Sequence, residues 1–138
     1  VPTGSASPDF YGGERPGDNR WANSVVALDG NTGQLRWGQQ LVHHDLWDYD
    51  VASQPTLATL IHDGKQVDAV IQATKIGGAP WLLDLKTGAV TRLYESCDGR
   101  RLSAPNDIVF DTSGGFWFSD LGKPLTSSSI MLNTRNIN

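Results

Sequence analysis

Residues 24–37 read SVVALDGNTGQLRW, and residues 80–93 read PWLLDLKTGAVTRL. Each stretch consists of an apolar run, a turn of the form Asp-x-x-Thr-Gly, and a second run in which apolar and polar residues alternate. A looser third copy, IVFDTSGGFWF, occupies residues 108–118. Asp and Gly are favoured in tight turns, and alternation is typical of strands with one buried face. The three stretches therefore predict antiparallel β-hairpins.

Further strand signals continue this pattern along the chain, and no helical pattern separates them. We expect eight strands, at residues 23–29, 34–39, 54–61, 66–73, 80–84, 89–95, 107–110 and 116–120, and an additional edge strand at 129–132. Sheets of four antiparallel strands, with about 40–50 residues each, are the blades of β-propellers. The sequence therefore predicts an all-β fold with about two antiparallel propeller blades per chain.

Composition excludes several classes of function. The 138 residues carry a formal net charge of −4, with 11 basic and 15 acidic side chains. No basic stripe indicates nucleic-acid binding, and no long apolar run indicates a membrane span. The single cysteine, Cys97, precludes an internal disulfide and is expected to serve packing. No signal peptide is visible, so we expect a soluble chain in either the cytoplasm or the periplasm.

Two isolated blades would leave strand edges and an apolar face uncovered, which favours association with other copies. We therefore expect a homo-oligomer. Three copies would supply roughly six blades and four copies roughly eight, and both numbers are usual for closed propellers. The alternative is a compact β-domain that protects its own edges.

The densest polar cluster is VHHDLWDYD, at residues 42–50. Carboxylates and imidazoles interleaved with aromatic residues do not suit a strand with one buried face, and they indicate a loop at a functional rim. A carboxylate beside Trp47 is expected to be partly desolvated, which raises a pKa and suits Asp48 for general-base catalysis. The alternative is that Asp45 and Asp48 accept backbone N–H bonds in turns. The adjacent histidines should point to opposite sides and are not expected to share a metal.

Four motifs in order resemble the pyrroloquinoline-quinone (PQQ) dehydrogenases of the membrane-bound glucose dehydrogenase type. They are RPGDN at 15–19, NSVVALD at 23–29, HDLWDYD at 44–50 and AVIQATKIG at 69–77. The resemblance covers about residues 10–77. It implies that Asp48 is the base that takes the proton from the substrate hydroxyl, and that Lys75 contacts the quinone carbonyls of PQQ. A cation there would stabilise charge that develops during hydride transfer.

Residues 80–123 resemble a different family, the SMP-30/gluconolactonase group of calcium-dependent lactonases. The most specific part is SAPND, at residues 103–107. The resemblance implies that Asn106 points into a central cavity and helps to hold a divalent cation or substrate. Calcium prefers such oxygen ligands.

The two resemblances together predict a fusion of two propeller fragments that join near residues 75–81. The predicted organisation is an irregular leading segment at 1–20, a quinoprotein-like segment at 21–77, a lactonase-like segment at 78–123 and an unassigned tail at 124–138.

The function predicted first is a calcium-dependent lactone or ester hydrolase, because a cation and a polarised water demand fewer protein groups than an enclosed quinone. Asp48 and Asp107 are the predicted catalytic carboxylates, and Asn106 and Asp50 are the predicted calcium ligands. One alternative is a non-catalytic propeller fragment or assembly. The other is a PQQ-dependent sugar or alcohol dehydrogenase remnant with Lys75 at the quinone.

Overall fold

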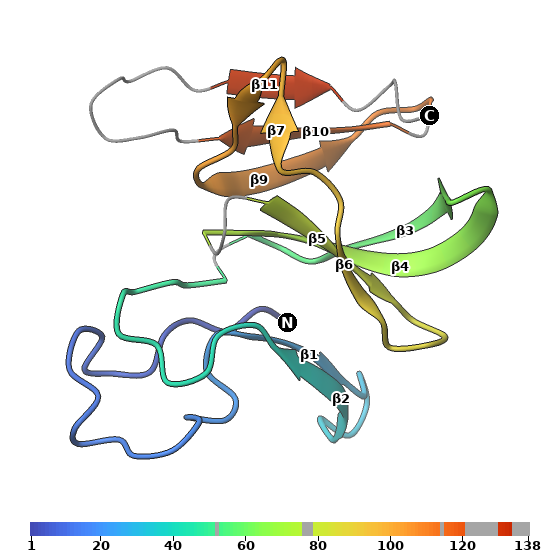
Figure 1. Cartoon of the computed structure of the whole chain (residues 1–138). Helices are drawn as coiled ribbons and strands as arrows, with labels where there is room; N and C mark the ends of the chain where they lie inside the picture. Colours follow the sequence, from blue (N-terminus) through green and yellow to red (C-terminus); the bar gives the residue numbers. More distant parts are fainter. Residues whose placement is uncertain (52, 76–78, 114, 121–129, 134–138) are drawn as a thin grey trace. The chain divides into compact units, whose positions relative to one another are not determined.

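A computed structural model describes residues 1–51, 53–75, 79–113, 115–120 and 130–133 (Figure 1). All regular structure in these residues is β-strand, arranged in antiparallel sheets. No helix among them is long and apolar enough to span a membrane. By contacts the chain divides into two compact units, Val1–Ala52 and Ser53–Asn138.

The first unit contains one hairpin, formed by β1 (Ser24–Leu28) and β2 (Leu35–Gln40). Asp29 shapes the turn between them, because its Oδ1 accepts hydrogen bonds from the backbone N–H groups of Asn31 and Thr32. Gly33 supplies the left-handed conformation that the turn requires, with φ of 70°. The Arg36 guanidinium and these N–H groups lower the pKa of the Asp29 carboxyl to about 2.

The second unit contains a four-stranded sheet with the strand order β3-β4-β5-β6. Its strands are β3 (Thr56–His62), β4 (Lys65–Thr74), β5 (Ala79–Asp84) and β6 (Val90–Arg92). The turn after β5 repeats the first hairpin, since Asp84 Oδ1 accepts from the N–H groups of Lys86 and Thr87. In both copies of the Asp-x-x-Thr-Gly motif, the Asp carboxylate thus stabilises the turn by accepting hydrogen bonds from the backbone of that turn.

Three further strands, in the order β11-β10-β9, form another sheet in the same unit. They are β9 (Pro105–Phe110), β10 (Phe116–Asp120) and β11 (Ile130–Asn133). A core of Ile71, Leu102, Phe116 and Phe118 joins β4 to β10, and Cys97 packs against it as expected. The two sheets therefore share one hydrophobic core.

The predicted fold class is confirmed, and each of the eight expected strands matches an observed one within a few residues. The short strands β7 (Ser96–Cys97) and β8 (Arg100–Arg101) were missed. Part of the predicted edge strand, residue 129, lies outside the described residues, whereas 130–132 fall in β11. The predicted boundary between the quinoprotein-like and lactonase-like segments, at residues 77 and 78, was drawn from family resemblance. In the chain it falls between β4 and β5, two strands that pair in one sheet.

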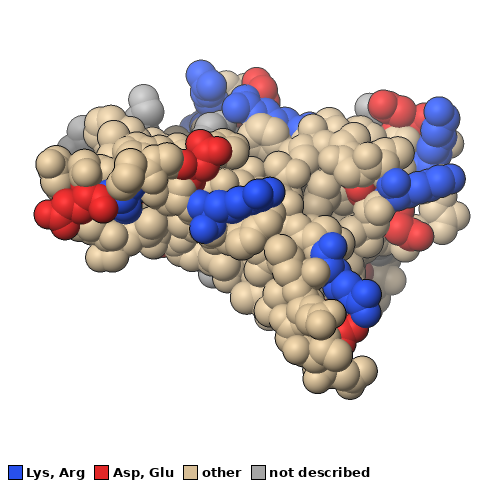
Figure 2. All heavy atoms as spheres, turned by 90° about the horizontal axis from the view of Figure 1, so that it is seen from below, with Lys and Arg blue, Asp and Glu red and all other residues tan. Residues whose placement is uncertain are grey.

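Charged side chains of both signs are interspersed on the face seen in Figure 2.

Candidate functional site

Asp45 organises the loop from Leu41 to Asp50 in the first unit. Its carboxylate is 2% exposed and accepts backbone N–H bonds from Trp47 at 2.9 Å and Tyr49 at 2.7 Å. Asn23 Nδ2 donates to the same carboxylate at 2.8 Å, and the Ser5 hydroxyl donates to it as well. One buried acceptor therefore ties the loop to two segments that are distant in sequence.

Burial alone raises the pKa of the Asp45 carboxyl, because it disfavours the charged form. The hydrogen bonds from Ser5, Trp47, Tyr49 and Asn23 favour the carboxylate and outweigh burial, so its pKa lies below the ordinary value of 3.8. Asp45 is therefore an anion that holds structure together. This role matches the alternative prediction that Asp45 accepts backbone N–H bonds in a turn.

Arg15 fixes the segment that faces this loop. Its guanidinium donates to the backbone oxygens of Pro8 at 3.1 Å and Asp9 at 3.3 Å, and also to the Asn19 side chain and the Asp45 carbonyl. The leading segment, which has no regular strand pattern, is therefore held by side-chain hydrogen bonds.

Asp48 lies within the loop that Asp45 shapes and is half-buried. Its backbone is left-handed, with φ of 56°. Trp47, which was expected to desolvate Asp48, is itself 71% exposed. Asp50 Oδ1 accepts a hydrogen bond from the backbone N–H of Ser5 at 2.7 Å, so this carboxylate also anchors the leading segment.

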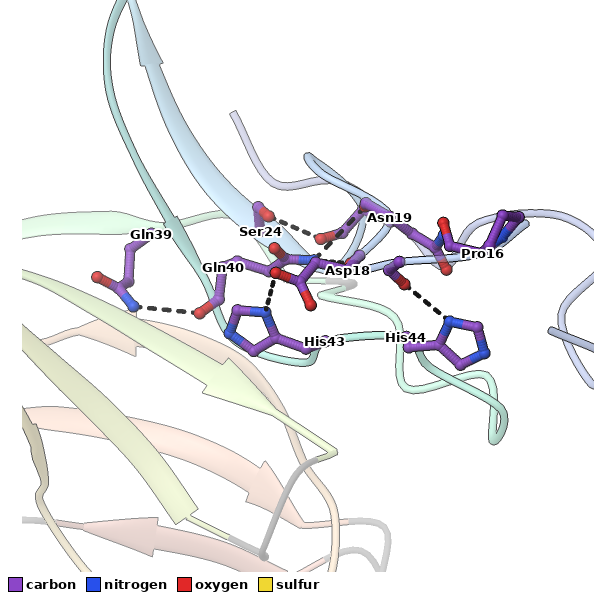
Figure 3. Close-up of polar contacts among 10 residues, drawn as sticks. Pro16, Asp18, Asn19, Ser24, Gln39, Gln40, His43 and His44 are labelled. Atoms are coloured by element: carbon purple, nitrogen blue, oxygen red, sulfur yellow. Dashed lines mark hydrogen bonds and ion pairs between the residues drawn. The ribbon is translucent and has the colours of Figure 1, made fainter.

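The two adjacent histidines have different partners (Figure 3). His43 Nδ1 lies 3.7 Å from Asp18 Oδ2, and both side chains are exposed. His44 Nδ1 lies 2.8 Å from the Gly17 carbonyl oxygen, which requires a proton on Nδ1. The two imidazoles thus contact different residues, Asp18 and Gly17.

His44 also borders an open cleft of about 570 Å³ in the first unit. The cleft is lined by Phe10, Tyr11, Gly12, Gly13, Pro16, Gly17, His44 and Leu46. A Cβ atom on Gly12 would lie 2.2 Å from His44 Nε2 and 2.8 Å from Leu46 Cδ2. A side chain at position 12 would therefore force the side chains of His44 and Leu46 to move.

Lys75 follows directly after β4 in the second unit and is half-buried. The strand that leads to it is buried from Ala69 to Thr74. The backbone of Lys75 therefore continues directly from a buried strand, whereas its side chain is partly accessible. This placement suits a residue that contacts an acceptor-rich ligand.

Asn106 and Asp107 lie at the start of β9, where Asn106 is half-buried and Asp107 is exposed. The buried carboxylate nearby is Asp120, whose oxygens accept the N–H groups of Ser103 at 2.8 Å and Ala104 at 2.9 Å. The SAPND motif is thus shaped by a carboxylate on the neighbouring strand.

No group of three or more His, Cys, Asp or Glu side chains among the described residues is placed to hold a metal ion. The predicted calcium ligands Asn106 and Asp50 therefore gain no support here.

Sequence reasoning missed the roles of Asn23, Arg15 and Asp120. Asn23 is 1% exposed although it begins the first strand motif, and Asp120 is 4% exposed at the end of β10. A polar residue that interrupts or ends an apolar strand is the signal that could have identified both.

The model of the PQQ-linked glucose/ethanol/alcohol dehydrogenase β-propeller domain matches residues 1–94. The quinoprotein glucose dehydrogenase of Escherichia coli K12 is 43% identical over 89 residues, which are 64% of this chain and 11% of that protein. The quinoprotein glucose dehydrogenase A of Acinetobacter calcoaceticus is 47% identical over 90 residues, again 64% of this chain and 11% of that protein. This chain thus spans about a tenth of the length of these relatives.

Among solved structures, the quinohemoprotein alcohol dehydrogenase of Comamonas testosteroni matches with a TM-score of 0.67 and 23% identity. The match covers 87% of this chain and 23% of that one. At this identity the likeness shows the propeller fold alone.

These matches contradict the first predicted function, so the calcium-dependent lactone or ester hydrolase is wrong. The relatives are quinone-linked dehydrogenases, and the family match continues to residue 94. The family match therefore extends beyond residues 75–81, where the two fragments were predicted to join. The SMP-30/gluconolactonase resemblance and the fusion are not shown by any of these findings.

Proposed function

Because the chain belongs to the PQQ-linked glucose/ethanol/alcohol dehydrogenase β-propeller family, we propose that it takes part in PQQ-dependent oxidation of a sugar or polyol. The observation that carries the proposal is that Asp48 and Lys75 both lie within the matched residues 1–94. Relatives are named as glucose, glycerol and quinate dehydrogenases. These names share a polyhydroxylated substrate, which is the class we propose.

The residues present are compatible with an anionic quinone. Lys75 offers a half-buried cation directly after β4. An ammonium group there would hold the acceptor oxygens of PQQ by charge-assisted hydrogen bonds. When bound, PQQ accepts the two electrons that leave the substrate carbon.

Asp48 supplies the proton acceptor in this proposal. Its carboxylate takes the proton from the substrate hydroxyl as the carbon is oxidised. Asp45 keeps the loop in shape by binding the N–H groups on either side, at Trp47 and Tyr49. The two carboxylates thus have separate roles, one chemical and one structural.

Replacing Lys75 tests cofactor binding directly. We expect Lys75→Ala to weaken PQQ binding by about 10- to 100-fold, the usual size for loss of one charged hydrogen-bond donor. Titration of the full chain with PQQ, followed by quenching of tryptophan fluorescence, measures the dissociation constant. Lys65→Ala is the matched control, because Lys65 is exposed at the other end of the same strand. Equal affinity of Lys75→Ala and wild type, or no saturable binding at all, would contradict the proposal.

We also propose that copies of this chain associate, as the sequence predicted. Strand register places Leu57, Val70, Leu83 and Val90 in one row across the four-stranded sheet. Leu57 is 73% exposed, and Ile61 on the same face is 72% exposed. Val70 in this row is already buried, so the apolar side chains that a second copy would cover are Leu57, Ile61 and Val90.

Native mass spectrometry tests this association, with three or four copies as the expected particle. Ile61→Lys should lower the copy number, because it places a charge on the face that would be buried. A single-copy mass at all protein concentrations would overturn the proposed association and leave the cofactor proposal intact.

A further inference from the structure

The side chain of Gln72 forms a buried clamp near the end of β4. It is 3% exposed, and its Nε2 lies 3.0 Å from the Ser53 carbonyl oxygen and 2.6 Å from Ser53 Oγ. The same Nε2 lies 2.8 Å from the carbonyl oxygen of Ala73. Ser53 Oγ donates to that Ala73 oxygen as well, at 3.2 Å.

The clamp lies near the end of β4, where β3 no longer pairs with it. β3 begins at Thr56, which pairs with Ile71, so no residue of β3 lies opposite Ala73. On the other side Ala73 pairs with Pro80, whose carbonyl accepts from the N–H of Leu93, so the backbone groups of Pro80 point away from Ala73. The amide of Gln72 and the hydroxyl of Ser53 therefore supply hydrogen bonds that strands provide elsewhere in β4.

The orientation of the Gln72 amide is determined by its neighbours. Two carbonyl oxygens lie against Nε2, and exchanging the amide nitrogen and oxygen would bring three oxygens together. Oε1 is buried and has no hydrogen-bond partner among the described residues. A buried acceptor without a donor costs stability, and this cost partly offsets the hydrogen bonds that Nε2 makes.

We propose that Gln72 and Ser53 form a positioning device for Lys75, three residues beyond Gln72. The clamp fixes the carbonyl of Ala73, and Ala73 is followed only by the buried Thr74 before Lys75. Holding this strand end in one place presents the Lys75 ammonium to the cofactor at a constant position. The inference rests on the proposed function, because it assigns the clamp to the same PQQ-binding lysine.

Gln72→Met is the variant that breaks the clamp. Methionine has a similar length and no donor, and it also removes the unpartnered oxygen, so the fold should survive. Gln66→Met is the matched control, since Gln66 is exposed on the same strand and the same face of the sheet. Ser53→Ala is a milder second variant that removes only the hydroxyl.

A double-mutant cycle on PQQ affinity distinguishes positioning from mere stabilisation. We expect Gln72→Met to raise the dissociation constant about tenfold in the wild-type background, a coupling usual within one hydrogen-bond network. In the Lys75→Ala background the same change should have no effect, and Gln66→Met should have none in either. Equal losses in both backgrounds, or no loss for Gln72→Met, would overturn the inference.

Amide hydrogen exchange of the free protein provides a readout that needs no cofactor. The amides from Ala73 to Lys75 should exchange faster in Gln72→Met and at the wild-type rate in Gln66→Met. Unchanged exchange would overturn the clamp itself. If Lys75→Ala leaves PQQ affinity unchanged, the proposed cofactor contact fails and the positioning role falls with it. Faster exchange in Gln72→Met would then still identify a structural clamp.

Discussion

Asp48→Asn should lower PQQ-dependent turnover of a sugar or polyol by about 10²–10⁴-fold, the usual contribution of a general base. The amide cannot take the proton from the substrate hydroxyl. Asn is accepted readily in the left-handed conformation that Asp48 adopts, with φ of 56°, so the loop should keep its shape. PQQ affinity should be unchanged, because Asp48 is not the group assigned to hold the cofactor. Dye reduction with glucose, glycerol and quinate measures the effect.

Asp63→Asn is the matched control for this prediction. Asp63 also has a left-handed backbone, with φ of 50°, and it lies exposed in the turn between β3 and β4. We expect wild-type turnover from it, because that turn has no assigned chemistry. Full activity of Asp48→Asn would remove the general-base role from this residue. Loss of PQQ binding in Asp48→Asn would instead indicate that the carboxylate supports the cofactor site.

Strand positions were predictable from the sequence where a recognisable turn motif links the two strands of a hairpin. Asp29 and Asp84 each bind the backbone of their own turn, and a glycine four residues later provides the positive φ. The strands β7 and β8 were missed because each has only two residues, too few for a visible alternation. Their turn, Asp98-Gly99, has φ angles of 48° and 73° and was the available signal.

Site chemistry was less predictable, because contacts between distant residues determine which carboxylate is structural. Asp45 and Asp48 are equivalent in a sequence pattern. Only the fold brings Asn23 and Ser5 to Asp45 and buries it. The hydrolase prediction depended on the SAPND motif at residues 103–107, which lies beyond the family match at residues 1–94. In the structure Asp120 binds the backbone of Ser103 and Ala104 within that motif.

Asp45→Asn should produce the largest loss of stability, about 2–4 kcal/mol, because the new amide would turn N–H groups toward the donors of Asn23 and Tyr49. Urea unfolding followed by tryptophan fluorescence measures the loss. Asp9→Asn is the control, since Asp9 is exposed in the same unit and should unfold like wild type. An unchanged unfolding midpoint for Asp45→Asn would contradict the structural role assigned to this carboxylate.

Wild type and Asp45→Asn should also differ in how their unfolding free energies depend on pH. The folded-state pKa of Asp45 lies below the ordinary value of 3.8, because its four hydrogen bonds outweigh burial. The unfolded chain therefore binds a proton more readily than the folded chain in acid. The stabilisation that Asp45 provides is fully present above its ordinary pKa and is lost as the pH falls through the folded-state value. The difference in unfolding free energy between wild type and Asp45→Asn should thus be constant near neutral pH and shrink below about pH 4. A difference that grew in acid would mean that the folded protein holds Asp45 protonated, and the loop would then be organised by a neutral acid instead of an anion.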